Sequence, residues 1–351
     1  MTDPHERTTN ENESNQGLDS YKPNALHPRE TSANILKTGC ERIDEILRGG
    51  IRTKQITEFV GENGTGKTQL MLQLMLTAQI SLEKGGLNGS CVYVSTEEAF
   101  AVSRLEEILR TNAFVRERLA NKAEALDRVY VFKAMGTAEN CWEVLRSISH
   151  ILRVPRDEEH PVKVIVIDSL TAPFRDDLEE IDMRGGNERQ RNMHRVILRA
   201  QFLYRFTHLL KEFAWKHDLA VVVTNHVVDS FEDESVYFTS KLTNNNKSVD
   251  GKGKGKQNEE EEEEENENDY YGKRAFVKRF KSSGRFVKPG LGLAWANCPN
   301  TSVFLSVEEQ FNGVKTRYAD AFRSPFAAPG ICKFRIATAG IINDDLDVDE
   351  E

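Results

Sequence analysis

Apolar runs alternate with helix-like segments along much of the chain. Runs rich in β-branched residues at 56–60, 91–95, 128–132, 164–167 and 220–224 predict buried strands. Apolar residues at helical spacing predict helices over 67–82, about 102–110, 138–152 and about 188–217. Buried strands that alternate with helices are typical of a mainly parallel, twisted sheet covered by helices on both faces. The pattern therefore predicts an α/β fold.

The last part of the chain follows a different pattern. After an apolar segment at 291–295, short strand patterns occur near 303–306, 315–321 and 332–337, with no helical segment between them. Strands without crossover helices pair in an antiparallel manner. We therefore expect an antiparallel C-terminal extension at one edge of the parallel sheet.

Three polar segments interrupt or flank this pattern. Residues 1–35 are rich in Asn, Glu, Thr and Ser, and we expect a disordered N-terminal tail. Residues 229–272 consist largely of Asn, Lys, Gly and Glu, which predicts a disordered acidic insertion. Residues 344–351 form an acidic C-terminal tail. The globular core is therefore predicted to span 36–343, with the insertion inside it.

Composition excludes several classes of protein. Of the 351 residues, 38% are hydrophobic, enough to bury a sizeable core, which excludes wholesale disorder. The cysteines are scattered and include no C-x-x-C pair, which fits a reduced compartment better than a disulfide framework or a zinc module. The N-terminal residues lack the apolar stretch of a secretory signal, and 70–82 is too short to cross a bilayer. We expect no membrane partner.

The net charge of −9 argues at first against a nucleic-acid binder. However, nine acidic residues lie within 259–269 and six within 344–351, so the rest of the chain carries a surplus of six positive charges. The two acidic runs set the overall sign. The net charge therefore does not exclude nucleic acid.

One motif carries the clearest chemistry. Residues Gly61, Glu62, Asn63, Gly64, Thr65, Gly66, Lys67 and Thr68, followed by Gln69, match G-x-x-x-x-G-K-[ST] in full. In such a P-loop the backbone N–H groups cradle phosphates, the lysine reaches the β- and γ-phosphates, and the hydroxyl ligates Mg²⁺. The alternative is a Gly-rich turn with an incidental lysine. The predicted strand before the motif and the helix after it favour a site for ATP and Mg²⁺.

Two acidic residues at predicted strand ends complement the motif. Asp168 ends the 164–167 strand, where it can hold Mg²⁺, although a terminal Asp can also simply begin a turn. Glu97 follows the 91–95 strand, where its carboxylate can accept a proton from an attacking water. Glu98 competes for that role, and an acidic start to the next helix is a further alternative.

The order of these motifs resembles the RecA-like recombinase superfamily and, within it, the eukaryotic recombinase paralogs. The resemblance begins with 38–51 and 56–58, continues through the P-loop, Thr96-Glu97, 167–169 and 223–225, and is most specific at 282–285 and 289–298. It covers about residues 36–340 and implies a RecA-like P-loop ATPase core.

Several roles follow from this resemblance by position. It implies that Lys67, Thr68 and Asp168 hold ATP and Mg²⁺ and that Glu97, rather than Glu98, activates water. It also implies that Arg104 packs on the adenine, and that Asn225 with the next residue forms a sensor of the γ-phosphate. His226 departs from the pattern, because core recombinases carry glutamine there. A histidine can still donate a hydrogen bond, but its reach and protonation differ.

A second departure concerns assembly. Core recombinases carry a helical DNA-binding lobe and a Phe-x-x-Ala tether before the ATPase, whereas about 35 low-complexity residues stand here. The resemblance therefore implies a nuclear assembly subunit in homologous-recombination repair of DNA double-strand breaks, paired with another recombinase paralog and acting on a core recombinase filament. An autonomous DNA-dependent ATPase that catalyses strand exchange is the alternative. A P-loop kinase or helicase would leave 38–51 and 289–298 unexplained.

Two basic segments are candidate contacts for single-stranded DNA or DNA junctions. The first contains Arg184, Arg189 and Arg191, with Arg195 and Arg199 continuing at four-residue spacing, and corresponds by resemblance to a first DNA loop. A solvated helix face with surface ion pairs is the alternative, favoured for Arg199 and Arg205.

The second segment, 273–288, holds seven basic residues and no acid, among them Lys278, Arg279 and Arg285. Phe276, Phe280 and Phe286 are interleaved, a combination suited to single-stranded DNA. A nuclear-localisation patch, or a strand whose phenylalanines face the core, are the alternatives. The acidic run at 259–269 could fold back on this segment and compete with DNA, or be a solvated linker.

Overall fold

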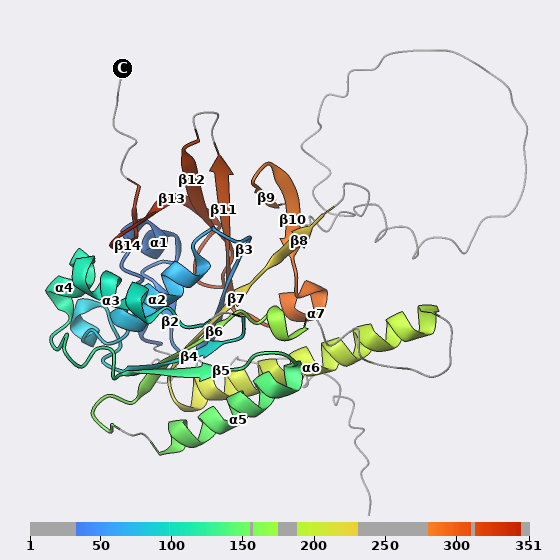
Figure 1. Ribbon diagram of the computed structural model, residues 1–351, viewed down its shortest axis with the longest axis horizontal. Helices are drawn as coiled ribbons and strands as arrows, with labels where there is room; N and C mark the ends of the chain where they lie inside the picture. Colours follow the sequence, from blue (N-terminus) through green and yellow to red (C-terminus); the bar gives the residue numbers. More distant parts are fainter. Residues whose placement is uncertain are drawn as a thin grey trace, which may run out of the picture. The chain divides into compact units, whose positions relative to one another are not determined.

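The computed structural model describes residues 33–97, 99–154, 157–174, 188–230, 280–309 and 313–344, without the side chains of 188–193 and 195. A nine-stranded sheet forms the centre of this part (Figure 1). Its strands, in spatial order, are β14 (Gly340–Asn343), β13 (Gly330–Ala337), β12 (Lys315–Arg323), β11 (Thr301–Glu309), β3 (Gln55–Gly61), β7 (Ala220–Asn225), β6 (Val162–Asp168), β4 (Ser90–Ser95) and β5 (Val129–Lys133).

The direction of the strands divides the sheet into two parts. From β11 to β5 all neighbours are parallel, whereas β11 to β14 pair as successive antiparallel strands. This arrangement confirms the predicted α/β fold and its antiparallel C-terminal extension. It also gathers the carboxyl ends of β3, β7, β6 and β4 at one edge of the sheet, where ligands of open α/β folds bind.

Helices cover both faces of the sheet (Figure 1). One face packs against α1 (Glu41–Ile46), α2 (Lys67–Thr77), α3 (Val102–Thr111) and α4 (Ala113–Arg118), and the other against α5 (Ala138–Arg153), α6 (Glu188–Lys216) and α7 (Gly292–Ala296). Short 3₁₀ turns lie at Leu82–Lys84 and Ala172–Phe174. None of the described helices is both long and apolar enough to cross a membrane.

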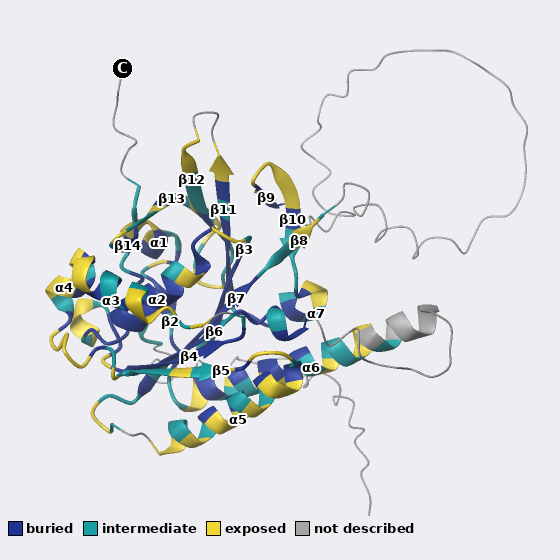
Figure 2. Ribbon diagram, in the orientation of Figure 1, coloured by how far each residue is buried: buried dark blue, intermediate teal, exposed yellow. Residues whose placement is uncertain are grey.

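The strand β6 shows how the sequence builds these two cores. Val164 and Val166 belong to the core under α2, whereas Ile165 and Ile167 belong to the core under α6. Successive side chains of a strand point to opposite faces, so a strand buried on both faces needs an uninterrupted apolar run. The central strands β3, β4, β6 and β7 are accordingly buried along almost their whole length (Figure 2).

Two small sheets complete the described structure. The strands β1 (Ile35–Leu36) and β2 (Ile51–Arg52) form a pair, and β8 (Val227–Asp229), β10 (Arg285–Pro289) and β9 (Phe280–Ser282) form an antiparallel sheet. A third apolar cluster, Val60, Phe280, Val287 and Phe304, joins this second sheet to the ends of β3 and β11. The β9–β10 hairpin is thereby fixed close to the P-loop.

Some predicted boundaries are wrong. The helix expected over 67–82 ends at Thr77, because the chain turns back and the Ala78 carbonyl accepts hydrogen bonds from Leu87 N–H and Gly89 N–H. Asp229, assigned to the acidic insertion, is instead the last residue of β8. Ile35, assigned to the disordered N-terminal tail, instead lies in the strand β1, where it pairs with Arg52. The predictions for 1–32, 231–272 and 345–351 concern residues outside the described part. Helices α1, α4 and α7 and strands β1, β2, β8 and β14 were not predicted, whereas β9 and β10 lie in the segment for which a strand was one alternative.

Candidate nucleotide-binding site

The P-loop connects the end of β3 to the start of α2, as predicted. Gly64 and Gly66 have φ angles of +81° and +106°, which L side chains rarely adopt. A Cβ atom on Gly61 would lie 2.5 Å from the Leu305 carbonyl oxygen, so only glycine fits there. Gly61 therefore allows a close approach of the backbone, and Gly66 allows the curvature that a phosphate-binding loop needs. A Cβ atom on Gly64 would meet nothing within 4 Å, so glycine is favoured there by its φ angle alone.

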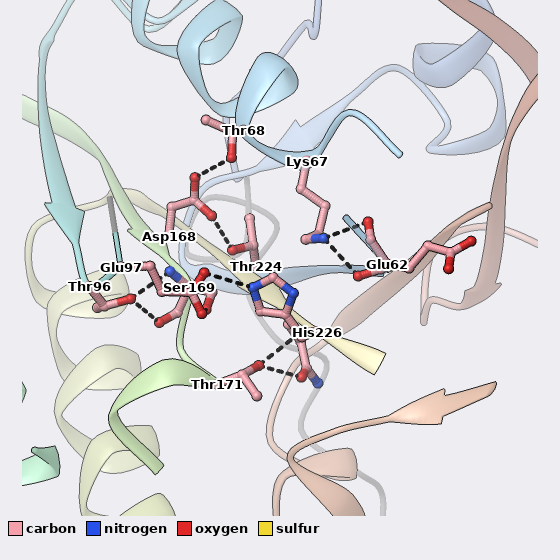
Figure 3. Close-up of polar contacts among 12 residues, drawn as sticks. Glu62, Lys67, Thr68, Thr96, Glu97, Asp168, Ser169, Thr171, Thr224 and His226 are labelled. Carbon is pink, nitrogen blue, oxygen red and sulfur yellow. Dashed lines mark hydrogen bonds and ion pairs between the residues drawn. The ribbon is translucent and has the colours of Figure 1, made fainter. Parts of the chain in front are cut away.

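Lys67 follows this loop as the first residue of α2, and its ammonium group donates to two main-chain acceptors of the loop. Its Nζ donates to the carbonyl oxygens of Gly61, at 2.7 Å, and Glu62, at 3.0 Å (Figure 3). Burial lowers the pKa of Lys67 to about 8, against the opposing effect of the Asp168, Glu97 and Glu62 carboxylates. A phosphate anion would offset this cost of burying the ammonium group, so the lysine fits a nucleotide ligand.

Thr68 and Asp168 meet although they are far apart in sequence. The Thr68 hydroxyl donates to Asp168 Oδ2 at 2.8 Å (Figure 3). The Tyr93 hydroxyl donates to the same oxygen at 2.7 Å. Thr224 donates to the other carboxylate oxygen. The described residues include no group of three or more His, Cys, Asp or Glu that could cage a metal. One carboxylate and one hydroxyl beside a phosphate site suit Mg²⁺, which usually keeps waters and shares phosphate oxygens.

Glu97 also reaches this edge, just beyond β4. Its Oε2 lies 3.2 Å from His226 Nε2, and the Ser169 hydroxyl donates to its Oε1 at 3.4 Å. The two side chains face each other (Figure 3). His226 follows the end of β7, so they come from strands on either side of β6. Because His226 stands where core recombinases carry glutamine, an imidazole lies directly against the carboxylate expected to activate water. Glu98 lies outside the described residues.

Asn225 reaches the strand end but turns into the core. It is fully buried, its Nδ2 donates to Glu58 Oε1 at 2.7 Å, and its Oδ1 accepts from Thr171 Oγ1 at 2.8 Å. The Trp295 indole N–H donates to the same Glu58 oxygen at 2.7 Å. Of the two predicted sensor residues, His226 alone faces Glu97. Glu58 was missed as a site residue, although a charged residue inside an apolar strand was a visible signal.

Arg104 and Gln69 were both predicted to contact the nucleotide, and the structure brings them together. Arg104 Nε donates to Gln69 Oε1 at 2.7 Å. Its guanidinium also donates to the carbonyl oxygens of Ala337, at 2.6 Å, and Thr338, at 2.9 Å. The arginine thus ties α2 and α3 to the turn between β13 and β14. This fixes the guanidinium at the side of the P-loop helix.

The predicted DNA contacts are only partly described. Arg184, Lys278 and Arg279 lie outside the described residues, and Arg189 and Arg191 lie in α6 without described side chains. Arg285 is described: its NH2 lies 2.9 Å from Glu62 Oε2 and its NH1 2.6 Å from Asp229 Oδ1.

Other side chains of the two basic segments contact neighbouring parts of the protein. Phe280 stacks on Phe304, with 4.3 Å between ring centroids, so the alternative of a core-facing phenylalanine holds at this position. Arg199 donates to the Gly290 carbonyl oxygen at 2.9 Å, and the Arg205 guanidinium lies 4.7 Å from the centre of the Trp142 ring. Arg199 is half-buried and bound to the main chain, which differs from the solvated face expected for it, whereas Arg205 is exposed, as that alternative predicts.

The sequence of this chain is similar to those of known proteins. The Rad51 family model matches residues 29–253. A DNA repair protein XRCC3 homolog from Arabidopsis thaliana is 30% identical over 338 residues, which cover 91% of this chain and 96% of the relative. The DNA repair and recombination protein RadA from Aeropyrum pernix is 34% identical over 199 residues, 56% of this chain and 55% of that protein. Similarity of this extent confirms the predicted resemblance to recombinase paralogs: the chain belongs to the Rad51 family, as a RecA-like paralog similar to XRCC3.

Proposed function

We propose that this chain is an ATP-binding recombinase paralog that acts in the nucleus, in homologous-recombination repair of DNA double-strand breaks. In this proposal it is a nucleotide-gated assembly subunit that pairs with another paralog and supports recombinase filaments on single-stranded DNA. The family consists of nucleotide-binding ATPases of DNA repair and recombination. The observation that carries the proposal is the meeting of Thr68 and Asp168 beside the P-loop lysine.

The residues of the site have separable tasks in this proposal. Lys67 would exchange its two carbonyl acceptors for phosphate oxygens, and the P-loop N–H groups would bind the remaining phosphate oxygens. Thr68 and Asp168 would hold Mg²⁺, which neutralises phosphate charge when bound. Arg104, fixed by Gln69, would pack on the base. These tasks concern binding, which is what gating by nucleotide requires.

Slow turnover is the second element of the proposal. A general base must be free to accept a proton from water. The Glu97 carboxylate is instead held by His226 on one oxygen and by Ser169 on the other. A site that binds nucleotide well and hydrolyses it slowly suits an assembly subunit, since the bound state then persists.

An autonomous DNA-dependent ATPase that catalyses strand exchange is the second candidate. It is favoured by the intact set of Lys67, Thr68, Asp168 and Glu97, which supplies a phosphate ligand, metal ligands and a base at one sheet edge. It requires that Glu97 leave His226 during the reaction. The two candidates therefore differ in turnover and not in binding.

Measuring ATP binding and ATP turnover on the purified chain, with and without single-stranded DNA, separates the two candidates. Lys67→Ala should weaken ATP binding at least about tenfold, because it removes a buried charge-assisted contact to phosphate. Lys84→Ala, which removes an exposed lysine, is the matched control and should bind normally. Tight binding with negligible turnover supports the assembly subunit, whereas DNA-stimulated turnover lost in Lys67→Ala supports the ATPase. Wild-type protein that binds no ATP would refute both.

The partner assignment needs its own measurement. Affinity capture of the tagged chain from DNA-damaged cells, with and without ATP, should recover another Rad51-family protein in a nucleotide-dependent manner. Recovery of the same partner by Lys67→Ala at wild-type yield would show that nucleotide does not gate assembly.

A further inference from the structure

The β9–β10 hairpin ends in a tight turn that gathers donor groups. Ser283 and Gly284 have φ angles of +48° and +76°, as in two-residue hairpin turns that reverse the chain sharply. Ser282 and Arg285 flank the turn and are directly paired across the hairpin. The turn thus places two hydroxyl groups and one guanidinium group together.

These donors converge on a single carboxylate, that of Glu62 in the P-loop. The hydroxyl groups of Ser282 and Ser283 both donate to Glu62 Oε1, and Arg285 NH2 donates to Oε2 at 2.9 Å. Burial acts to raise the pKa of Glu62, but the hydrogen bonds from these three side chains outweigh it and lower the pKa below its usual value. Three side-chain donors of the turn thus bind one carboxylate of the same chain.

The site is built before any ligand arrives. Ser282 is buried, and its Oγ accepts a hydrogen bond from the Val307 N–H at 3.1 Å, which leaves its hydroxyl proton for the anion. The Ser283 N–H in turn donates to the Val307 carbonyl oxygen at 2.8 Å. Below the turn, Phe280 stacks on Phe304. A donor set fixed in this way loses little freedom when it binds.

We propose that the turn of Ser282, Ser283 and Arg285 is a site for a backbone phosphate of single-stranded DNA, and that Glu62 occupies it in this structure as an internal substitute. A carboxylate and a phosphate both offer two adjacent oxygens to a guanidinium group. The hairpin is the C-terminal part of the basic stretch 273–288, whose positive charge favours a phosphate backbone as the ligand. The inference rests on the proposed DNA-binding function.

A second carboxylate, that of Asp229, also competes with DNA phosphate for Arg285. Asp229, at the end of β8, lies 2.6 Å from Arg285 NH1 through an ion pair in which both side chains are about half exposed. DNA must therefore displace two carboxylates from one guanidinium group. The Glu62 main-chain carbonyl also accepts a hydrogen bond from Lys67, so the residue that occupies the turn belongs to the loop expected to hold the nucleotide.

Binding of a fluorescent oligothymidylate, measured without nucleotide at several salt concentrations, tests the site. Asp229→Asn and Glu62→Gln each remove one competing charge, so each should tighten binding about three- to tenfold at low salt and steepen the salt dependence by about one counterion. Adding Arg285→Ala to Asp229→Asn should abolish the gain. Glu143→Gln removes a distant exposed carboxylate that pairs with Arg146 and is the charge-matched control.

The outcomes separate the site from the proposed function. Tighter DNA binding by Asp229→Asn and Glu62→Gln, but not by Glu143→Gln, supports the site. This holds even if the wild-type chain binds no DNA. Equal affinity of all variants, or an equal gain in Glu143→Gln, overturns the site and leaves DNA binding intact. If no variant binds DNA, both the site and DNA binding are refuted, while ATP affinity still tests the nucleotide part. If Arg285→Ala weakens ATP binding and not DNA binding, the phosphate belongs to the nucleotide, which also overturns the inference.

Discussion

Asp44 shows how a single buried side chain makes stability depend on pH. It lies in α1, 8% exposed, and its Oδ1 accepts hydrogen bonds at 2.8 Å from the Thr38 N–H and the Thr38 hydroxyl. Burial raises the pKa of Asp44 from 3.8 to about 7, and the Thr38 hydrogen bonds oppose this only in part. The folded protein therefore binds this proton more tightly than the unfolded chain.

This difference predicts a loss of stability as the pH rises. Between pH 5 and 7 the folded state holds the Asp44 proton while the unfolded state has released it, so Asp44 should lower the free energy of unfolding by about 2 kcal/mol over this range. Asp44→Asn cannot titrate and should lack that part of the pH dependence. Urea unfolding at pH 5, 6 and 7 measures it, with Glu143→Gln as an exposed-carboxylate control. Parallel pH profiles of wild type and Asp44→Asn would contradict the assignment.

At the scale of elements, the β9–β10 hairpin combines a packed side and an exposed side. Phe280 is 7% exposed and contacts Phe304 and Phe322, whereas Phe286, on the partner strand, is 38% exposed. The sequence alone assigned both rings to the same basic and aromatic stretch. The structure separates them, because the apolar cluster beneath the hairpin accommodates Phe280.

The two rings should therefore respond differently to truncation. Phe280→Ala should lower the free energy of unfolding by about 3 kcal/mol, since it opens a cavity in that cluster. Phe286→Ala should change stability by less than about 1 kcal/mol and instead weaken oligothymidylate binding through the loss of a stacking surface. Thermal unfolding and DNA titration of both variants check this. Weaker DNA binding in Phe280→Ala at unchanged stability would reverse the two roles.

At the scale of the whole molecule, charge is distributed unevenly along the chain. Nine of the acidic residues lie within 259–269, directly before the basic stretch 273–288. Segments this close in sequence stay within reach of each other, although exposed charges interact over only about 10 Å at 0.1 M salt. The acidic run, which lies outside the described residues, is therefore a potential competitor of DNA.

Replacing 259–269 with a Gly/Ser linker of equal length tests this competition without shortening the insertion. We expect DNA binding about three- to tenfold tighter at 50 mM salt, with the gain shrinking as salt screens the charges. Affinities that match the wild type at every salt concentration would identify the run as a solvated linker. A gain that persists at high salt would point to a steric rather than an electrostatic effect.

The sequence by itself determined the local features of this protein. The P-loop could be recognised because its glycines, lysine and threonine act within eight consecutive residues between a strand and a helix. The parallel strands could be predicted because a strand buried on both faces requires an apolar run such as 164–167. The end of α2 at Thr77 could not be predicted. It depends on hydrogen bonds that the Ala78 carbonyl accepts from the Leu87 and Gly89 N–H groups, and not on helix propensity.

Only the tertiary structure decided which distant side chains meet. The sheet places β7 between β3 and β6, which brings Thr68 against Asp168, 100 residues later, and His226 against Glu97. The contact between Glu62 and Ser282 spans 220 residues and depends on how the hairpin packs on β11. The order of strands in a sheet depends on burying both of its faces at once, so no local sequence pattern determines it. The chemistry of each residue could therefore be predicted from the sequence, whereas the side chain that it contacts could not.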